Sequence, residues 1–395
     1  MTISLILLCV LAAPAILWGR LAHFRRNSEH IADRAEADRL TWAWRAACEG
    51  SGVARVVQTV TGPTVSTPAV VSIVLGPPTV LVIRLLPGQV LADLRKAGPR
   101  MAPHLGAVAL RWERRGHEHA RVELLHVDPL TDPIGIVDAD PLAPVLLART
   151  EEGTDIRLPW DDWTHWAIQG ATGSGKSSWL YSILGAAADR ARAAHDLVIA
   201  GVDPSGLLLR PFARSDVHAR WQVCGLSDLD RVDKLLTWLV SEMDRRIENL
   251  PAAADSVVTG PDLPRVLCVM EEYPALLRAA DTHDNKLGKR IRALVGRLLS
   301  ESRKAGYSII LVAQRAEATL MGGNERAQCE SRLSFRCDGP DSVKLLHPSA
   351  DPGLSDALIE SPPGIGLLNL PGRPLSRVRA PWAGGYAAYV ERVTR

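Results

Sequence analysis

Short apolar runs alternate with longer amphipathic stretches over the second half of the chain. The runs are rich in branched side chains and cover residues 164–168, 197–202, 266–270 and 307–313. Runs of this kind, bounded by polar residues, predict strands that are buried on both faces of a parallel sheet. Because stretches with helical spacing separate them, we expect an α/β domain over residues 147–385 with helices on both faces of the sheet. Residues 386–395 are expected to form a tail.

A different pattern covers residues 53–146, where β-branched runs are separated by Gly-Pro and Pro-Gly turns. Residues 91–105 have helical spacing, with an interruption expected at Gly98-Pro99. An Asp- and Pro-rich connector follows at 128–144. These features predict a small α+β domain. Its predicted strands are 53–60, 70–75, 79–84, 108–112 and 120–125.

The N-terminus carries a separate apolar segment, Ile3–Trp18, which is close to the shortest length that spans a bilayer. Arg20, Arg25 and Arg26 follow it, and no Lys or Arg precedes it. The positive-inside rule then places the N-terminus outside and the body of the chain in the cytoplasm. We therefore expect residues 1–27 to be a single-pass anchor in the cell membrane. The alternative is a cleaved or interfacial segment.

Composition adds little to this picture. Residues 28–52 are charged and helix-permissive, which predicts a juxtamembrane helix or linker without chemistry of its own. The net charge of +2 over 395 residues neither indicates nor excludes a nucleic-acid binder. The six cysteines form no C-x-x-C pair, so we interpret those beyond Cys9 as reduced cytosolic thiols.

The chemistry centres on residues 170–177, Gly-Ala-Thr-Gly-Ser-Gly-Lys-Ser, which match the phosphate-loop pattern G-x-x-x-x-G-K-[ST]. A predicted strand precedes the loop and a predicted helix follows it, so backbone N–H groups and the helix N-terminus would face the phosphates of ATP. Lys176 would reach the β- and γ-phosphates, and the Ser177 hydroxyl would bind Mg²⁺. The predicted nucleotide-binding residues are Gly170, Ala171, Thr172, Gly173, Ser174, Gly175, Lys176, Ser177 and Ser178.

A second motif follows the apolar run 266–270, which ends in Glu271-Glu272. Two carboxylates after a buried strand are typical of a Walker B motif. We expect Glu271 to bind Mg²⁺ and Glu272 to activate the attacking water. Asp is usual at the first position, and the extra methylene of Glu271 displaces its oxygens by about 1 Å, which matters in a positioned site.

For several other residues the sequence pattern is compatible with two different roles. Asp203 ends a predicted strand, either beside the ligand or as a structural turn residue. Gln314 ends another and could sense the γ-phosphate. Arg332 could act as an arginine finger on a neighbouring subunit's nucleotide, or form a surface ion pair. Residues 286–304 are rich in Lys and Arg, which indicates either a DNA-contacting surface or a solvated helix face.

Together these residues resemble the FtsK/SpoIIIE DNA translocases, and more closely the Tra proteins that move double-stranded plasmid DNA between mycelia in actinomycetes. The resemblance covers about residues 76–382, and Glu271-Glu272-Tyr273-Pro274 is similar to the Tra branch. The other matching motifs are His165–Gly170, Asp203-Pro204, Glu242–Arg246, Arg303–Gly306, Val312–Arg315, Ser331-Arg332 and Pro363–Gly366.

The resemblance implies a RecA-like motor that assembles as a homo-hexamer and pumps double-stranded DNA with ATP and Mg²⁺. It favours Gln314 as γ-phosphate sensor and Arg332 as trans-acting finger, with Lys176 and Glu272 as the other catalytic residues. Residues 53–146 are similar to the smaller domain beside the motor in that family. About a dozen residues follow Trp382, too few for a winged helix, so we expect non-specific DNA recognition or a separate DNA-reading partner.

The leading hypothesis is a membrane-anchored, ATP-driven DNA translocase for conjugative transfer of a plasmid or integrative element. A chromosome-segregation translocase is one alternative. A protein-export ATPase is another, although such proteins usually carry several ATPase modules and this sequence has one phosphate loop. A third is a nucleotide-binding membrane scaffold whose hydrolysis is weakened by Glu271.

Overall fold

The computed structural model describes residues 31–395 except 61, 136–139, 216–220, 316–322 and 351. The chain divides into two compact units, Met1–Pro129 and Leu130–Arg395. The predicted anchor at 1–27 lies outside the described residues. Among the helices that the structure describes, none is both long and apolar enough to cross a membrane.

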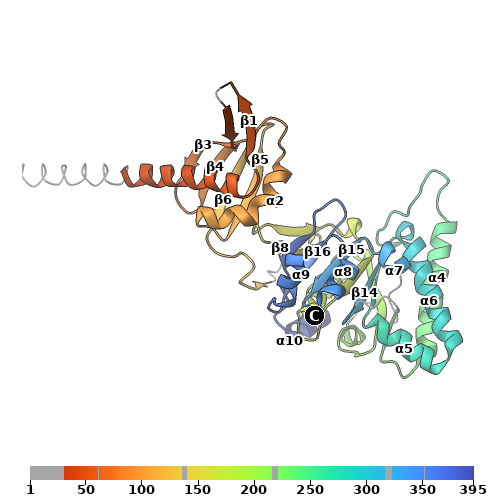
Figure 1. Cartoon of the computed structure of the whole chain (residues 1–395). Coiled ribbons are helices and arrows are strands. Elements are labelled where there is room, and N and C mark those ends of the chain that lie inside the picture. The colour runs from red at the N-terminus through yellow and green to blue at the C-terminus, as the bar shows by residue number, and fades with distance from the viewer. Residues whose placement is uncertain (1–30, 61, 136–139, 216–220, 316–322, 351) are drawn as a thin grey trace, which may run out of the picture. The chain divides into compact units, whose positions relative to one another are not determined.

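The first unit combines a long helix over residues 31–50 with a four-stranded antiparallel sheet in the order β3-β4-β6-β5 (Figure 1). The buried core joins Leu40 and Trp44 of the helix to Ile83 and Trp112 of the sheet. The predicted strands 108–112 and 120–125 are confirmed as β5 and β6, which are antiparallel neighbours. The strands are β1 (Arg55–Thr59), β2 (Gly62–Ser66), β3 (Ala69–Val74), β4 (Thr79–Arg84), β5 (Ala109–Arg115) and β6 (His119–Leu125), with β1 and β2 forming a separate hairpin.

The second helix of this unit, α2 (Leu91–Met101), continues through Pro99, so the interruption predicted there is wrong. A 3₁₀ turn, Ala102–Leu105, follows it. Gly98 lies against the indole of Trp112, and an added Cβ would come within 3.1 Å of its Nε1. The close approach of α2 to the sheet therefore explains the glycine.

The second unit is built on one ten-stranded sheet in the order β12-β11-β13-β14-β10-β15-β16-β17-β8-β9. The first six strands in this order are parallel, and the last four are antiparallel. The predicted α/β fold is confirmed. Its strands are β7 (Ile134–Gly135), β8 (Val145–Thr150), β9 (Asp155–Leu158), β10 (Trp166–Gln169), β11 (Leu197–Asp203), β12 (Gln222–Cys224), β13 (Arg265–Met270), β14 (Tyr307–Ala313), β15 (Ser331–Phe335), β16 (Ile365–Asn369), β17 (Ser376–Arg379) and β18 (Pro381–Trp382).

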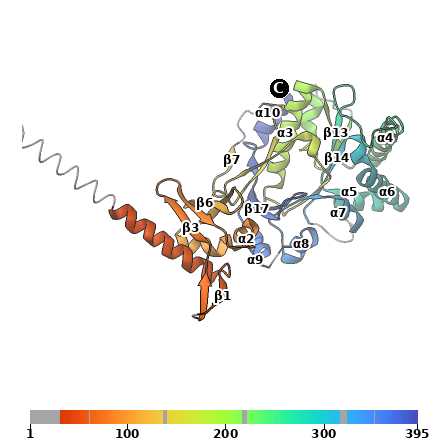
Figure 2. The ribbon, with the colours of Figure 1, turned by 90° about the horizontal axis from the view of Figure 1, so that it is seen from above.

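Helices cover both faces of this sheet, and each face has its own core (Figure 2). Helices α3 (Lys176–Ala194) and α10 (Tyr386–Thr394) pack on one face, whereas α4 (Leu229–Glu248), α5 (Tyr273–His283) and α6 (Asn285–Glu301) pack on the other. Shorter helices are α7 (Gly323–Gln328), α8 (Pro340–Leu346) and α9 (Pro352–Ile359). Two-sided burial explains why the parallel strands read as continuous apolar runs.

Two segments differ from their predicted placement. Residues up to 146 were expected in the small domain, but the division falls at Pro129–Leu130 because β7 pairs with β18 and β8 pairs with β17 in the second unit. Residues 386–395 are α10 rather than a tail. Arg392 of this helix donates a hydrogen bond to Asp189 of α3 at 2.6 Å, and Val393 is fully buried.

Candidate nucleotide-binding site

A row of tryptophans fixes the strand and the helix that flank the phosphate loop. Trp163, Trp166 and Trp179 are fully buried, and neighbouring ring centroids lie 5.3 and 5.4 Å apart. Trp166 belongs to β10 and Trp179 to the first turn of α3. The indole N–H of Trp179 also donates to the carbonyl oxygen of Leu147 on β8, at 2.9 Å. Aromatic packing therefore sets the angle at which the strand enters the loop and the helix leaves it.

The loop is further tied to its neighbours through its backbone. Ala171 donates to the carbonyl of Arg336 at 2.8 Å, and Gly170 donates to that of Gln314 at 3.3 Å. Gly173 and Gly175 have φ values of 74° and 109°, which glycine adopts without a Cβ clash. The loop thus has the fixed curvature that directs several N–H groups at one anion.

Gly175 also meets the turn that contains Gly364. The Gly364 N–H donates to the Ser174 carbonyl at 2.8 Å, and a Cβ on Gly175 would lie 2.5 Å from the Gly364 nitrogen. The sequence motif Pro363–Gly366 therefore has a physical role. It forms a wall against which the phosphate loop rests, and only glycine at 175 permits the contact.

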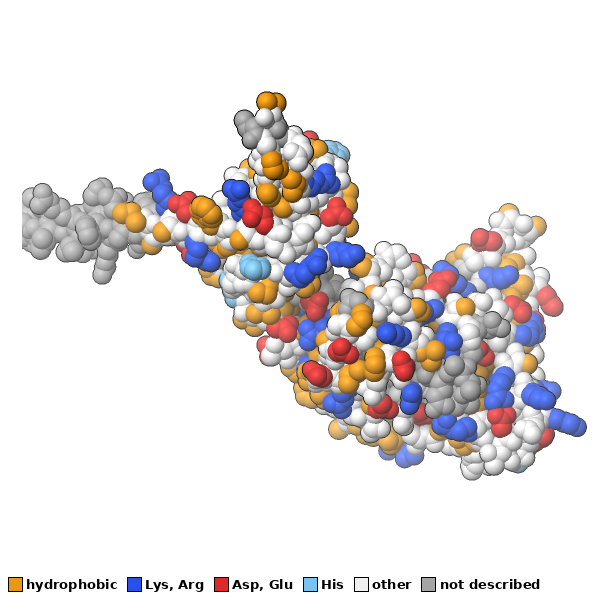
Figure 3. Space-filling model, in the orientation of Figure 1, with side chains coloured by type: hydrophobic (Ala, Val, Ile, Leu, Met, Phe, Trp, Pro, Cys, Tyr) orange, Lys and Arg blue, Asp and Glu red, His pale blue; other side chains and the backbone are white. Residues whose placement is uncertain are grey.

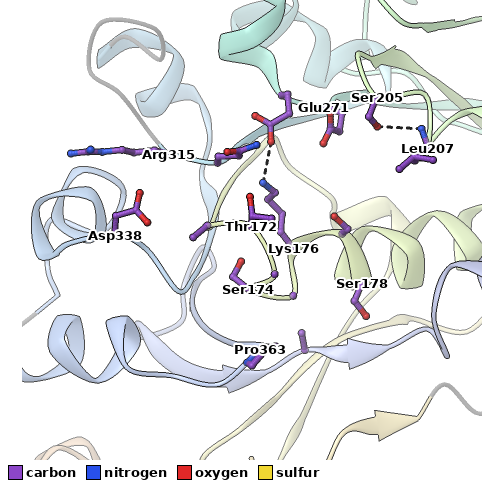
Figure 4. Close-up of a pocket in the computed structure, with 18 of the residues that line it drawn as sticks. Thr172, Ser174, Lys176, Ser178, Ser205, Leu207, Glu271, Arg315, Asp338 and Pro363 are labelled. Carbon is purple, nitrogen blue, oxygen red and sulfur yellow. Dashed lines mark hydrogen bonds and ion pairs between the residues drawn. The ribbon is translucent and has the colours of Figure 1, made fainter.

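Lys176 and Glu272 form an ion pair at the centre of the site (Figure 4). The Nζ of Lys176 lies 3.1 Å from Oε1 of Glu272 and 3.2 Å from the carbonyl oxygen of Gly170, and the lysine is 7% exposed. Glu272 caps α5 in the left-handed region, with φ 45°. Such a backbone is uncommon outside glycine and clusters at functional sites.

Glu271 lies beside this pair in an unusual environment. Its Oε2 is buried and has no hydrogen-bond partner among the described residues. Burial, followed by the charges of Glu272 and Asp203, raises the pKa of Glu271 to about 7, against the opposing influence of Lys176. The Glu271 carboxylate and the exposed Ser177 hydroxyl line the same pocket and offer the hard oxygen donors that Mg²⁺ prefers, so the residues present fit that ion.

Asp203 was expected either beside the ligand or as a structural turn residue, and the structure shows the turn role. It is fully buried, and its Oδ2 accepts hydrogen bonds from the backbone N–H groups of Leu208 and Leu209 at 2.7 and 2.9 Å. Its Oδ1 accepts one from the Ser205 hydroxyl at 2.8 Å. With both oxygens occupied, Asp203 shapes the loop while its neighbours Pro204 and Ser205 line the pocket.

Most of the predicted site residues converge on one pocket of about 1230 Å³. Its lining includes the phosphate loop from Ala171 to Ser178, the carboxylates Glu271 and Glu272, and Gln314 after β14. Sequence reasoning missed other lining residues, because nothing local marks them. These include Arg278, Arg315, Asp338, Arg379, Pro381 and Trp382. In Figure 4, Arg315 extends away from Lys176 on the side of Asp338.

Arg332 is not brought to this pocket. Its guanidinium donates to the backbone carbonyls of Cys329, Leu346 and Arg326 at 3.0, 3.0 and 2.8 Å. These bonds hold together the segments around β15 within one chain. The trans-acting role of Arg332 stays a prediction, and this geometry gives the residue a structural role as well.

The arginines of the basic segment 286–304 are engaged in ion pairs with acids of neighbouring segments. Figure 3 shows Lys and Arg side chains interspersed with Asp and Glu on the visible face. Arg297, for example, lies 2.8 Å from Asp244 of α4. The other pairs are Arg290–Asp233, Arg292–Asp281 and Arg303–Glu330. For these arginines the reading as a solvated, ion-paired helix face is the better one. Lys286, Lys289 and Lys304 are exposed and remain available for an anionic partner.

A phosphate loop at the carboxyl edge of a parallel sheet, with two carboxylates facing its lysine, defines a P-loop ATPase-like protein. Residues 138–259 match the FtsK/SpoIIIE family model, so the predicted resemblance is confirmed and the chain carries a domain of that family. The DNA translocase FtsK of Tropheryma whipplei is 25% identical over 264 residues, covering 62% of this chain and 33% of the relative. That of Halalkalibacterium halodurans is 26% identical over 252 residues, covering 59% and 30%. The chain thus spans about a third of the length of these relatives.

Solved structures share the fold at low sequence identity. The pCW3 conjugation coupling protein TcpA, in a monomer form with ATPγS, has a TM-score of 0.51 at 15% identity, covering 87% of this chain and 95% of that chain. EssC (ATPases 2 and 3) from Geobacillus thermodenitrificans has a TM-score of 0.53 at 15% identity, covering 67% and 50%. The type VII secretion ATPase EccC of Thermomonospora curvata has a TM-score of 0.50 at 20% identity, covering 68% and 32%.

Proposed function

We propose that this chain is an ATP-driven translocase of double-stranded DNA. The observation that carries the proposal is the ion pair between Lys176, which lies in the segment 138–259 that matches the FtsK/SpoIIIE family model, and Glu272, which follows β13. The curated relatives described above are DNA translocases, whereas the structural likeness extends to both conjugation and secretion ATPases. Sequence similarity therefore favours DNA over protein as the cargo.

We propose that these side chains act in hydrolysis as follows. When ATP enters, Lys176 moves from Glu272 to the β- and γ-phosphates, and Glu272 is left free to accept a proton from a water molecule. The water oxygen attacks the γ-phosphorus, and the bond from that phosphorus to the β–γ bridging oxygen breaks with its electron pair leaving on ADP. Ser177 and Glu271 would hold Mg²⁺, which neutralises charge on the phosphates. Gln314 lies at the pocket wall, where it can sense the γ-phosphate.

The biological setting belongs to the same proposal. The apolar segment Ile3–Trp18, with arginines behind it, supports a cell-membrane anchor and a cytoplasmic motor. Translocases of this kind need a ring around the DNA, so we propose a homo-hexamer. The likeness to a conjugation coupling protein over most of both chains supports a role in conjugative DNA transfer.

Hydrolysis by the purified chain, measured with and without double-stranded DNA, tests the proposal. We expect DNA to stimulate turnover, and Lys176→Ala and Glu272→Gln each to abolish it. Hydrolysis that is indifferent to DNA but rises with a secreted protein would instead support an export ATPase. Binding of ATP without turnover under any condition would support a nucleotide-binding scaffold.

A further inference from the structure

The pocket extends past the phosphate loop on the side away from the catalytic carboxylates. Glu271 and Glu272 follow β13, and Gln314 follows β14, so all three lie on one side of β10 in the sheet. The γ-phosphate must face these residues. The rest of the nucleotide therefore leaves toward β15, β16 and β17, on the other side of β10. Figure 4 shows the same division, with Glu271 on one side of Lys176 and Pro363 on the other.

Strand β18 lies on that second side, next to the first turns of α3. The Ser182 hydroxyl is 3.2 Å from the Pro381 carbonyl oxygen and 3.0 Å from that of Ser178. Ser178 is the last residue of the predicted phosphate-binding set and lines the pocket. Ser182 thus ties Pro381, the residue before Trp382, to the turn of α3 that carries Ser178, and both Trp382 and Ser178 line the pocket.

Among the described tryptophans of this unit, Trp382 alone lines the pocket, since the partly exposed Trp221 and Trp238 lie beside α4 and β12. Trp160, Trp163, Trp166 and Trp179 are buried, whereas Trp382 is 51% exposed and lines the pocket. Pro133 also lines the pocket, and it directly precedes β7, which pairs in parallel with β18. A proline and a half-exposed indole together present a flat apolar surface to the cavity.

We propose that Trp382 stacks on the base of the bound nucleotide and gives the site a preference for purines over pyrimidines. This inference rests on the proposed nucleotide hydrolysis and extends it to the base. Stacking depends on the area of the π-face rather than on hydrogen-bonding edges. ATP and GTP should therefore bind similarly, and CTP more weakly because its ring is smaller.

Titration calorimetry on the full chain with ATP, CTP and inorganic tripolyphosphate tests this, each in the presence of Mg²⁺. Trp382→Ala should weaken ATP binding roughly tenfold, a loss of about 1.4 kcal/mol that stacking can supply. Its affinity for tripolyphosphate should not change, and its ATP-to-CTP affinity ratio should fall toward one. Trp382→Phe should retain most of the ATP affinity. Trp42→Ala, which removes another exposed tryptophan that does not line the pocket, should change none of these values.

Unchanged ATP affinity in Trp382→Ala would overturn the inference. So would an equal loss of ATP and tripolyphosphate affinity, because that pattern reports damage to the phosphate loop rather than loss of a base contact. Absence of ATP binding by the wild-type chain would overturn both this inference and the nucleotide site. Loss of ATP affinity in Trp382→Ala, with hydrolysis that ignores DNA, would support the base contact and overturn the translocase alone.

Discussion

Lys176 of the phosphate loop and Glu272 of the Walker B segment are 96 residues apart in sequence, yet their charged atoms lie 3.1 Å apart. The lysine is almost fully buried, and its other bond is to the carbonyl oxygen of Gly170 in its own loop. In this arrangement the carboxylate that we propose to activate water is paired with the lysine that we propose to bind the phosphates. The proposed hydrolysis therefore requires Lys176 to exchange the Glu272 carboxylate for the phosphates of ATP.

This pairing predicts the behaviour of Glu272→Gln. The amide keeps the shape of the side chain but cannot accept the proton from water, so kcat should fall by roughly 10²- to 10⁴-fold. ATP binding should persist or tighten, because Lys176 no longer has to leave a carboxylate. Steady-state hydrolysis and equilibrium ATP binding measure the two effects. Glu360→Gln, at an exposed site, should change neither. A loss of ATP affinity that matches the loss of turnover would contradict this account.

Glu271 predicts a pH dependence of stability. Its pKa is about 7 in the folded protein, so between about pH 4.5 and 7 the folded chain keeps a proton that the unfolded chain has released. The free energy of unfolding contributed by this group is therefore highest at low pH and falls as pH rises toward 7. Glu271→Gln removes the titration, and the variant should gain stability relative to wild type as pH rises.

The size of this effect can be measured by thermal unfolding of both proteins between pH 5 and pH 8, without nucleotide. One pKa unit is about 1.4 kcal/mol, and 1 kcal/mol shifts the Tm of a domain of this size by roughly 2–4 °C. Allowing for partial solvent screening, the Tm difference should change by about 5 °C across this range. A difference that stays constant with pH would show that Glu271 is already ionised at pH 5.

Gly175 and Gly173 form a matched pair for the loop. Both have positive φ, but a Cβ on Gly173 meets open space, whereas one on Gly175 would lie 2.5 Å from the Gly364 nitrogen. Gly173→Ala should cost only the backbone strain, roughly 1–2 kcal/mol. Gly175→Ala should lower the Tm of the nucleotide-free protein at least twice as much, because the Gly364 turn must also move. Equal Tm losses in the two variants would show that the loop does not rest on that turn.

The sequence predicted the central part of the second unit well, because its strands are buried on both faces and carry a continuous apolar signal. The phosphate loop and the carboxylates after β13 could also be predicted, because each is a local sequence motif beside such a strand. The antiparallel strands β17, β8 and β9 at one end of the sheet are short and partly exposed, so only their pairing shows that they belong to this sheet. The helix α10 was not predicted, because its apolar side chains are buried only by packing against α3 and the rest of that core.

Charge was harder to interpret than hydrophobicity. The segment 286–304 has the composition of a DNA-contacting helix, but Arg290, Arg292 and Arg297 are paired with acids on α4 and α5 that are distant in sequence. The role of Asp203 was also left open by the sequence, because an Asp at the end of a strand can face a ligand or shape a turn. In the structure its carboxylate accepts hydrogen bonds from backbone N–H groups a few residues ahead. The acidic partners of Arg290 and Arg297 are set by tertiary structure, which a single sequence does not display, whereas those of Asp203 are set by a local turn.

Arg332 gives the last prediction, since its guanidinium bridges three carbonyl oxygens within one chain. Arg332→Ala leaves these acceptors without their donors, and hydrogen bonds to charged groups contribute about 1.5–3 kcal/mol each. The Tm should fall by roughly 5 °C or more. Arg332→Lys should recover only part of it, because an ammonium group cannot reach all three positions of the planar fork.

Thermal unfolding and hydrolysis by the same preparations separate a structural role from a catalytic one. Arg297→Ala is the matched control. It removes an arginine whose ion pairs with Asp244 and Glu301 are at the surface, and it should shift the Tm by less than about 2 °C. Lost turnover in Arg332→Ala with an unchanged Tm would contradict the structural role. That result would restore the predicted finger, because a residue that acts only on a neighbouring subunit's nucleotide need not stabilise its own fold.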